Sequence, residues 1–180
     1  MVLKRNMMEF QEMKERLTNK FILLDTNVIA RSFEHFDNFE GFLRFFQETE
    51  CALTYFPMIE FEFLRGAHLA EHRKARTEFL KTLAFEQMPF DPQVVYDALK
   101  IANAYVARNR KLTPSIVDCC IAAYLKEYAD NLYLATLNHS DFPTYLFDRI
   151  YVWPVDTEKD VFPIGIYQFN TQKAKDIGVL

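Results

Sequence analysis

The sequence predicts an α/β fold built around a mostly parallel sheet. Short apolar segments alternate along the chain with longer segments in which apolar residues recur every three or four positions, as on one face of a helix. Such alternation is typical of a parallel sheet covered by helices. The expected strands are residues 21–25, 51–56, 83–90, 131–136 and 149–154. The tail at 161–169 could add an extra edge strand.

The elements before the second strand have clear patterns. FILLD at 21–25 is apolar until it ends in Asp25, as in a strand covered on both faces. An amphipathic helix is expected before it, over residues 1–18. A second helix is expected after it, over 33–46, and its apolar face would pack in the core or in a dimer. That face comprises Phe33, Phe36, Phe39, Leu43 and Phe46.

The remaining helices follow the later strands. Pro57 suits the first turn of a helix that runs on through residues 59–70. Further helices are expected over 73–82, 92–109 and 114–128.

Composition indicates one globular domain. The chain has 180 residues, half of them hydrophobic, with 18 Phe, 9 Tyr and few Gly or Pro, which excludes a disordered or low-complexity protein. The first twenty residues are too charged for a secretory signal, and no apolar run approaches the ~18 residues of a membrane span. A cytoplasmic protein without membrane contact is therefore expected.

The cysteines agree with a reducing compartment. Cys119 and Cys120 are adjacent, which is a poor geometry for a mutual disulfide, and Cys51 leaves an odd count. They are expected to be buried, reduced packing residues, and the lack of a CxxC motif argues against zinc.

Acidic residues lie where a parallel sheet places its functional site, beyond the carboxyl ends of the strands. Asp25 ends the first strand, Asp141 follows the fourth, and Asp118 lies near the start of the helix at 114–128. The helix after the second strand carries Glu60 and Glu62, which lie ~200° apart, so only one can face the site. Four carboxylates from separate segments can converge.

Carboxylates suit Mg²⁺ or Mn²⁺, because these hard cations prefer oxygen ligands. Two such ions ~3.5–4 Å apart can position a water for attack on phosphorus and neutralise the leaving oxyanion. They would also offset the formal net charge of −4, which is otherwise unusual for a nucleic-acid-binding protein.

Four segments together resemble PIN-domain nucleases in order and spacing. They are LLDTNVI (23–29), IEFEFLRGA (59–67), VDCCIAAYL (117–125) and TLNHSDF (136–142). The resemblance covers about residues 20–155 and implies a three-layer α/β/α sandwich with a five-stranded sheet. An N-terminal helix over 1–19 and a C-terminal extension over 156–180 would exceed this core.

The resemblance implies a metal-dependent endoribonuclease whose catalytic and metal-binding residues are Asp25, Glu62, Asp118 and Asp141. Glu62 is preferred because it lies in the family-like EFLRG, and Glu60 is the alternative. Four polar residues are expected to orient the acids by hydrogen bonds: Thr26, Asn27, Thr136 and Asn138. Many small members are toxins of bacterial toxin–antitoxin pairs, so RNA, an antitoxin protein and a second copy of the chain are the expected partners.

Basic residues could bind the RNA backbone. The expected contacts are Arg65, Arg108, Arg110 and Lys111, whereas the cluster at 72–76 is interpreted as a solvated helix end. His139 is interpreted as a loop histidine without a catalytic role.

Two other functions remain open. An Asp-based phosphatase would show DxD after the first strand, but Asn27 replaces the second acid. A catalytically weak or inactive PIN-like interaction domain would need none of the four acids.

Overall fold

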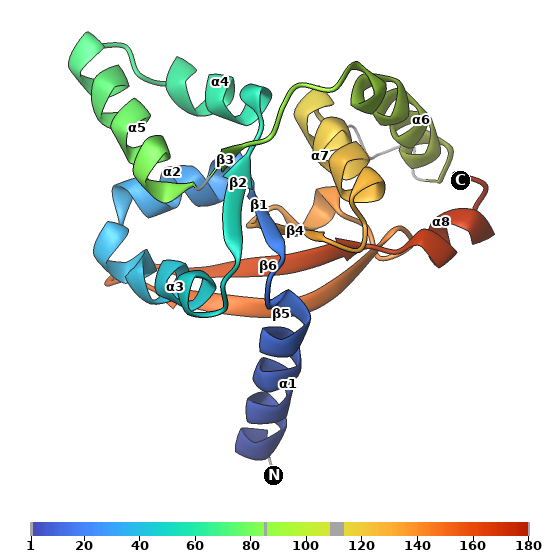
Figure 1. Cartoon of the computed structure of the whole chain (residues 1–180), viewed down its shortest axis with the longest axis horizontal. Coiled ribbons are helices and arrows are strands. Elements are labelled where there is room, and N and C mark those ends of the chain that lie inside the picture. Colours follow the sequence, from blue (N-terminus) through green and yellow to red (C-terminus); the bar gives the residue numbers. More distant parts are fainter. Residues whose placement is uncertain (1, 85, 109–113, 180) are drawn as a thin grey trace.

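Six strands form one mixed sheet at the centre of the computed structural model (Figure 1). In chain order they are β1 (Phe21–Leu24), β2 (Ala52–Tyr55), β3 (Glu86–Gln87), β4 (Leu132–Thr136), β5 (Phe147–Asp156) and β6 (Val161–Phe169). Their order across the sheet is β3-β2-β1-β4-β6-β5. The structure describes residues 2–84, 86–108 and 114–179, with the backbone alone for residues 2–7 and 108.

Strands β1 to β4 form the parallel part of the sheet. Ile22, Leu23 and Leu24 of β1 are fully buried, as expected for a strand between two layers. The carboxyl ends of β1 and β4 lie side by side, with Leu24 opposite Ala135. The residues that follow these two strands therefore meet at one edge of the sheet.

The third strand is shorter than the predicted 83–90. Its ladder joins Thr54 to Glu86 and Tyr55 to Gln87, and the amide of Met88 adds one bond to the carbonyl of Tyr55 at 2.8 Å. Pro89 follows, and proline has no N–H with which to extend a ladder.

The C-terminal tail forms a strand, but the expectation that it lies at an edge is wrong. β6 runs antiparallel between β4 and β5 and makes the sheet six-stranded instead of five-stranded. The tail folds back through a tight turn in which Thr157 N–H donates to the carbonyl of Asp160 at 2.8 Å. Burial explains the order: Ile164 and Ile166 are fully buried, while most of β5 is partly exposed.

Eight helices occur in the described part of the chain, in the order α1 (Val2–Leu17), α2 (Thr26–Glu34), α3 (Phe36–Glu48), α4 (Pro57–Arg65), α5 (Ala70–Leu83), α6 (Pro92–Arg108), α7 (Ile116–Glu127) and α8 (Thr171–Asp176). Helix α7 packs on β4 and β6, and α6 packs on α7. Helices α1 and α3 contact β5 from the other side (Figure 1). The predicted three-layer α/β/α arrangement is confirmed.

The helix predicted over 33–46 is two helices that break at His35. Phe33 ends up in α2 and packs against Phe63 and Phe79, with ring centroids 5.8 and 5.3 Å apart. Phe39 and Phe46 are buried in the core, so that part of the aromatic stripe packs within the chain.

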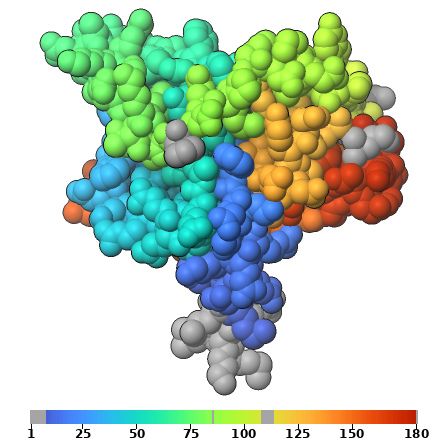
Figure 2. All heavy atoms as spheres, viewed as in Figure 1, coloured from blue at the N-terminus to red at the C-terminus, as the bar shows by residue number. Residues whose placement is uncertain are grey.

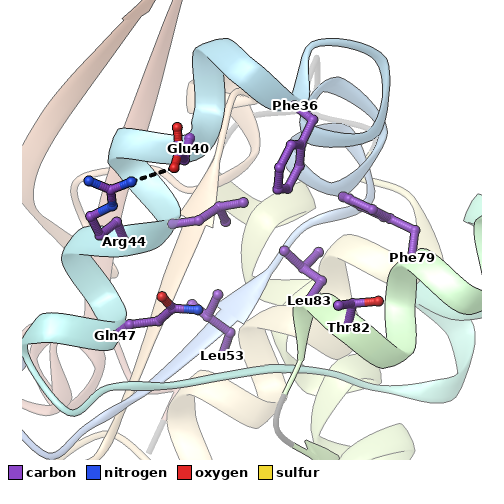
Figure 3. Close-up of a pocket in the computed structure, with 9 residues that line it drawn as sticks. Phe36, Glu40, Arg44, Gln47, Leu53, Phe79, Thr82 and Leu83 are labelled. Atoms are coloured by element: carbon purple, nitrogen blue, oxygen red, sulfur yellow. Dashed lines mark hydrogen bonds and ion pairs between the residues drawn. The ribbon is translucent and has the colours of Figure 1, made fainter.

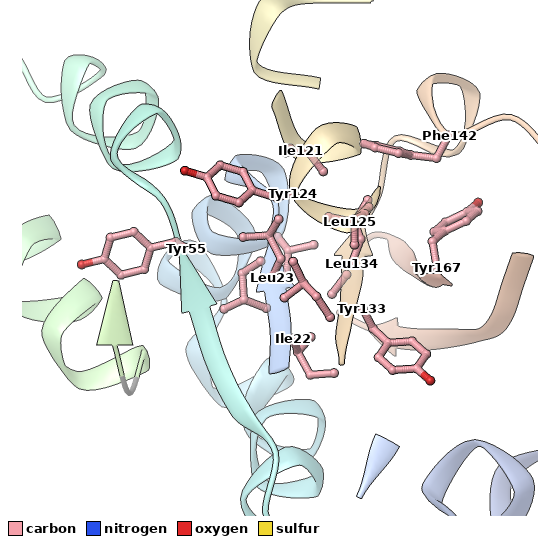
Figure 4. Packing of buried hydrophobic residues seen from close by; sticks show 14 of the residues in the cluster. Ile22, Leu23, Tyr55, Ile121, Tyr124, Leu125, Tyr133, Leu134, Phe142 and Tyr167 are labelled. Carbon is pink, nitrogen blue, oxygen red and sulfur yellow. The ribbon is translucent and has the colours of Figure 1, made fainter. Parts of the chain in front are cut away.

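The centre of the core lies between β1, β4 and α7. Figure 4 shows Leu23 and Leu134 packed beneath Ile121 and Leu125 of α7. Cys119 and Cys120 are buried in the same helix and, like Cys51, are free thiols. Among the described residues, no helix is both long enough and apolar enough to cross a membrane.

Candidate metal-binding acid cluster

Asp25 lies directly after β1 as the N-cap residue of helix α2. Its side chain is only 5% exposed, and its Oδ2 accepts hydrogen bonds from Thr136 Oγ1 at 2.5 Å and Asn27 Nδ2 at 2.7 Å. Burial raises the pKa of this carboxyl to about 6; the hydrogen bond from Thr136 opposes that rise, and the negative charge of Asp118 adds to it. Asp25 is thus a carboxylate held in place at an electrostatic cost.

The polar residues around Asp25 tie α2 to the segment after β4. Asn27 Oδ1 accepts from the amide of Leu137 at 3.0 Å, and the amide of Asn138 donates to Thr136 Oγ1 at 2.9 Å. These hydrogen bonds therefore hold Asp25 and Asn27 against a segment that lies about 110 residues later in the sequence.

Glu62 reaches the same place from α4. Its Oε2 accepts a hydrogen bond of 2.8 Å from Thr26 Oγ1, on the residue directly after Asp25. Glu60 points elsewhere, because its Oε2 accepts from Gln87 Nε2 of β3 at 2.5 Å. Two residues on one helix ~200° apart cannot face one site, and in the structure Glu62 is the one that bonds to Thr26, the neighbour of Asp25.

Asp118 occupies the first turn of α7 in a reciprocal cap with Ser115. Ser115 Oγ donates to Asp118 Oδ2 at 2.6 Å, and the amide of Asp118 donates to Ser115 Oγ at 3.1 Å. Burial raises the pKa of Asp118, Ser115 opposes this, and the negative charges of Asp141 and Glu62 raise it further. The charge of Asp118 also raises the pKa of Asp25, so Asp118 interacts electrostatically with all three other acids.

Asp141 lies on a short 3-10 turn, η1 (His139–Asp141), after β4. Asn138 Nδ2 donates to its Oδ2, and Tyr105 of α6 donates to its main-chain carbonyl at 2.9 Å. Sequence reasoning missed Tyr105, which looks like one apolar position of a helix face. It also missed Ser115, although a serine three residues before an acid at a helix start is a capping signal.

Comparison with known proteins identifies the family. The family model described as PIN domain matches residues 22–141, which is 120 of the 180 residues and ends at the last of the four acids. The chain belongs to the PIN-domain family. No curated protein is similar enough to count as a match. PIN is a nuclease-type fold whose nucleases act on nucleic acids and generally use divalent metals, and some PIN domains are inactive.

The donors in this PIN domain suit a hard divalent cation. Asp25, Glu62, Asp118 and Asp141 offer carboxylate oxygens. Burial is the main cause of the raised pKa values of Asp25 and Asp118, neighbouring negative charges add to it, and a bound cation would offset both. Within the described residues, no three His, Cys, Asp or Glu side chains are arranged closely enough to hold a metal ion. Instead, each acid has one oxygen held by a neighbouring donor: Thr136, Thr26, Ser115 or Asn138.

His139 has a structural position beside the PIN-domain acids. Its Nε2 lies 2.9 Å from the carbonyl of Pro163, so this nitrogen must donate. Its Nδ1 lies 2.7 Å from the hydroxyl of Tyr167. Both ring nitrogens hold η1 to β6.

Of the expected substrate-binding residues, Arg65 is exposed at the end of α4. Arg110, Lys111 and the side chain of Arg108 lie outside the described residues. The interpretation of the cluster at 72–76 as solvated is wrong for Arg76, which is partly buried. Its guanidinium donates to the carbonyl of Phe63 and lies over that ring, 4.9 Å from the centroid.

Proposed function

We propose that this PIN domain is a metal-dependent endoribonuclease that uses Asp25, Glu62, Asp118 and Asp141 to hold Mg²⁺ or Mn²⁺. The observation that carries the proposal is the position of Asp118, whose charge interacts with the other three acids although all four come from separate segments. An interaction domain without catalysis has no need for three carboxylates whose negative charges act on a fourth, Asp118. The phosphatase alternative lacks the second acid after β1.

The protein's own residues would orient the ligands. Thr136 and Asn27 fix one oxygen of Asp25, Thr26 fixes one oxygen of Glu62, and Ser115 fixes one oxygen of Asp118. These contacts limit side-chain rotation, so less conformational entropy is lost when a ligand binds. A bound divalent ion would supply Lewis acidity toward a phosphate and a water that ionises near neutral pH.

Matched glutamate variants test the proposal. Cleavage of a labelled single-stranded RNA in Mn²⁺ is measured for Glu62→Gln and Glu60→Gln. The two glutamates share a helix and differ in what they face, so Glu62→Gln is expected to lose at least 100-fold in activity and Glu60→Gln to remain near wild type. Cleavage that persists in excess chelator, or equal losses in both variants, contradicts the assignment.

For the biological role, we propose an RNA-cleaving toxin that acts in the cytoplasm and is neutralised by an antitoxin protein. Support comes from the four sequence segments that resemble toxin-type PIN ribonucleases and from three free thiols, which suit a reducing compartment. Induced expression should arrest bacterial growth, and Asp25→Asn should abolish the arrest. Normal growth with active, soluble wild-type protein contradicts the toxin role and leaves the ribonuclease proposal intact.

A further inference from the structure

An exposed aromatic residue lies next to the acid cluster on helix α4. Phe61 precedes Glu62 and is 66% exposed, which is unusual for a phenylalanine. It borders a shallow hollow of about 470 Å³ together with Leu64, Arg65 and Arg73. The space-filling view shows α4 and α5, which contribute these residues, gathered into a lobe that projects from the molecule (Figure 2).

Helix geometry connects this hollow to the acids. Phe61 and Arg65 are four residues apart, so they lie on one face of α4. Glu62 is ~100° around the helix from Phe61, on the adjacent face that turns toward Thr26. A strand of nucleic acid that leaves the acid cluster across α4 would therefore meet Phe61 and Arg65 first.

The charges of the hollow suit phosphate. Within the described part of the chain, the guanidinium groups of Arg65 and Arg73 have no ion-pair partner. Glu60 also borders the hollow, with one carboxylate oxygen held by Gln87, and the two arginines outweigh its single negative charge. Arg73 borders a second hollow of about 530 Å³ as well, with His68 and Lys74, so basic side chains continue along α5.

The hollow between α3 and α5 offers a contrast. It is similar in size, about 540 Å³, and is bordered by the apolar residues Phe36, Phe79 and Leu83 (Figure 3). Its arginine, Arg44, is already paired with Glu40. It therefore presents aromatic surface without a free cation.

We propose that Phe61, Arg65 and Arg73 form a binding site for one nucleotide of a single-stranded RNA, with the base stacked on the Phe61 ring and a phosphate held by the two guanidinium groups. Base–aromatic stacking tolerates any base, so the site would anchor the strand without selecting its sequence. The inference rests on the proposed ribonuclease function, because it assigns this hollow to the same substrate.

The test measures binding without cleavage. Fluorescence anisotropy in EDTA follows a labelled single-stranded RNA of about a dozen nucleotides. Phe61→Ala is expected to weaken binding about tenfold, Phe61→Tyr to restore it, and Phe36→Ala, an exposed aromatic in the contrasting hollow, to leave it unchanged. Arg73→Gln should lower the slope of log affinity against log salt by about 0.7, whereas Lys81→Gln, whose lysine pairs with Glu78 on the same helix, should not.

The outcomes separate the two proposals. Wild-type affinity in Phe61→Ala, or RNA binding by wild type that is undetectable in EDTA, overturns the nucleotide site. A Phe61 surface that serves a protein partner instead would give the first of these results. Binding that depends on Phe61 in a wild-type protein that never cleaves RNA supports the site and refutes the ribonuclease proposal.

Discussion

Replacing Asp25 with asparagine should stabilise the metal-free protein at neutral pH. Burial raises the pKa of Asp25 from 3.8 to about 6, so the folded chain resists ionising this carboxyl. When Asp25 is ionised in both the folded and the unfolded chain, this rise in pKa lowers the free energy of unfolding by about 3 kcal/mol. Asparagine carries no charge and keeps an oxygen that can accept from Thr136 and Asn27, so a net gain of about 1–3 kcal/mol is expected.

The gain should depend on pH in a defined direction. Below about pH 4 the carboxyl is protonated in the folded and the unfolded chain alike, and Asp25→Asn should differ little from wild type. As the pH rises through 6, wild type loses stability and the variant does not. The decisive comparison is urea unfolding of both proteins with EDTA at about pH 3.5 and about pH 7.5.

Asp97→Asn is the matched control with the opposite sign. Asp97 is also buried, but Lys126 and Lys100 lie 2.7 and 3.0 Å from its carboxylate and hold its pKa below the usual range, with Lys126 contributing most. That stability is present above pH 4 and is lost as the pH falls through the lowered pKa. Asp97→Asn should therefore destabilise the protein at pH 7.5. If Asp25→Asn also destabilises it there, burial of Asp25 is not costly and the reasoning fails.

Three further predictions concern the surroundings of the site. Tyr105→Phe should remove the hydrogen bond to the carbonyl of Asp141, lower the free energy of unfolding in urea by about 1 kcal/mol and reduce kcat. An unchanged free energy of unfolding and an unchanged kcat would show that this contact does not position η1. Gly165→Ala should destabilise by about 1–3 kcal/mol, because a Cβ would clash with the Tyr167 ring, whereas Gly41→Ala, with nothing within 4 Å, should be neutral or stabilising. Equal melting temperatures for the two variants would contradict this. Replacing Arg108, Arg110 and Lys111 together with alanine should raise KM and flatten the salt dependence of cleavage without changing kcat. Salt slopes identical to those of wild type would show that these side chains do not contact the RNA.

Much of the fold could be predicted because the parallel strands are buried on both faces. The run from Phe21 to Leu24 is apolar throughout, and its abrupt end at Asp25 marks both the strand end and the site. The place of β6 could not be predicted, because alternation within a strand carries no information about its neighbours. The pairing of Thr136 with Gly165 across the sheet depends on the whole core.

In the site, as in the sheet, features with a local sequence signal differ from features that arise only on folding. The acids could be placed because strand ends and helix starts are local signals. Tyr105 and Arg76 could not, since each acts through a main-chain carbonyl brought close only by folding: Tyr105 on Asp141, and Arg76 on Phe63. The preference for Glu62 over Glu60 stays a prediction, although Glu62 bonds to Thr26 and Glu60 to Gln87.

Mn²⁺ binding, followed by electron paramagnetic resonance at pH 7.5, tests most directly whether the four acids form one metal site. Wild type should bind the ion, and Asp118→Asn, the substitution at the centre of the cluster, should weaken binding by at least tenfold, while Glu60→Gln keeps the wild-type Kd. If Asp118→Asn and Glu60→Gln bind Mn²⁺ as tightly as wild type, the acids do not form a shared metal site.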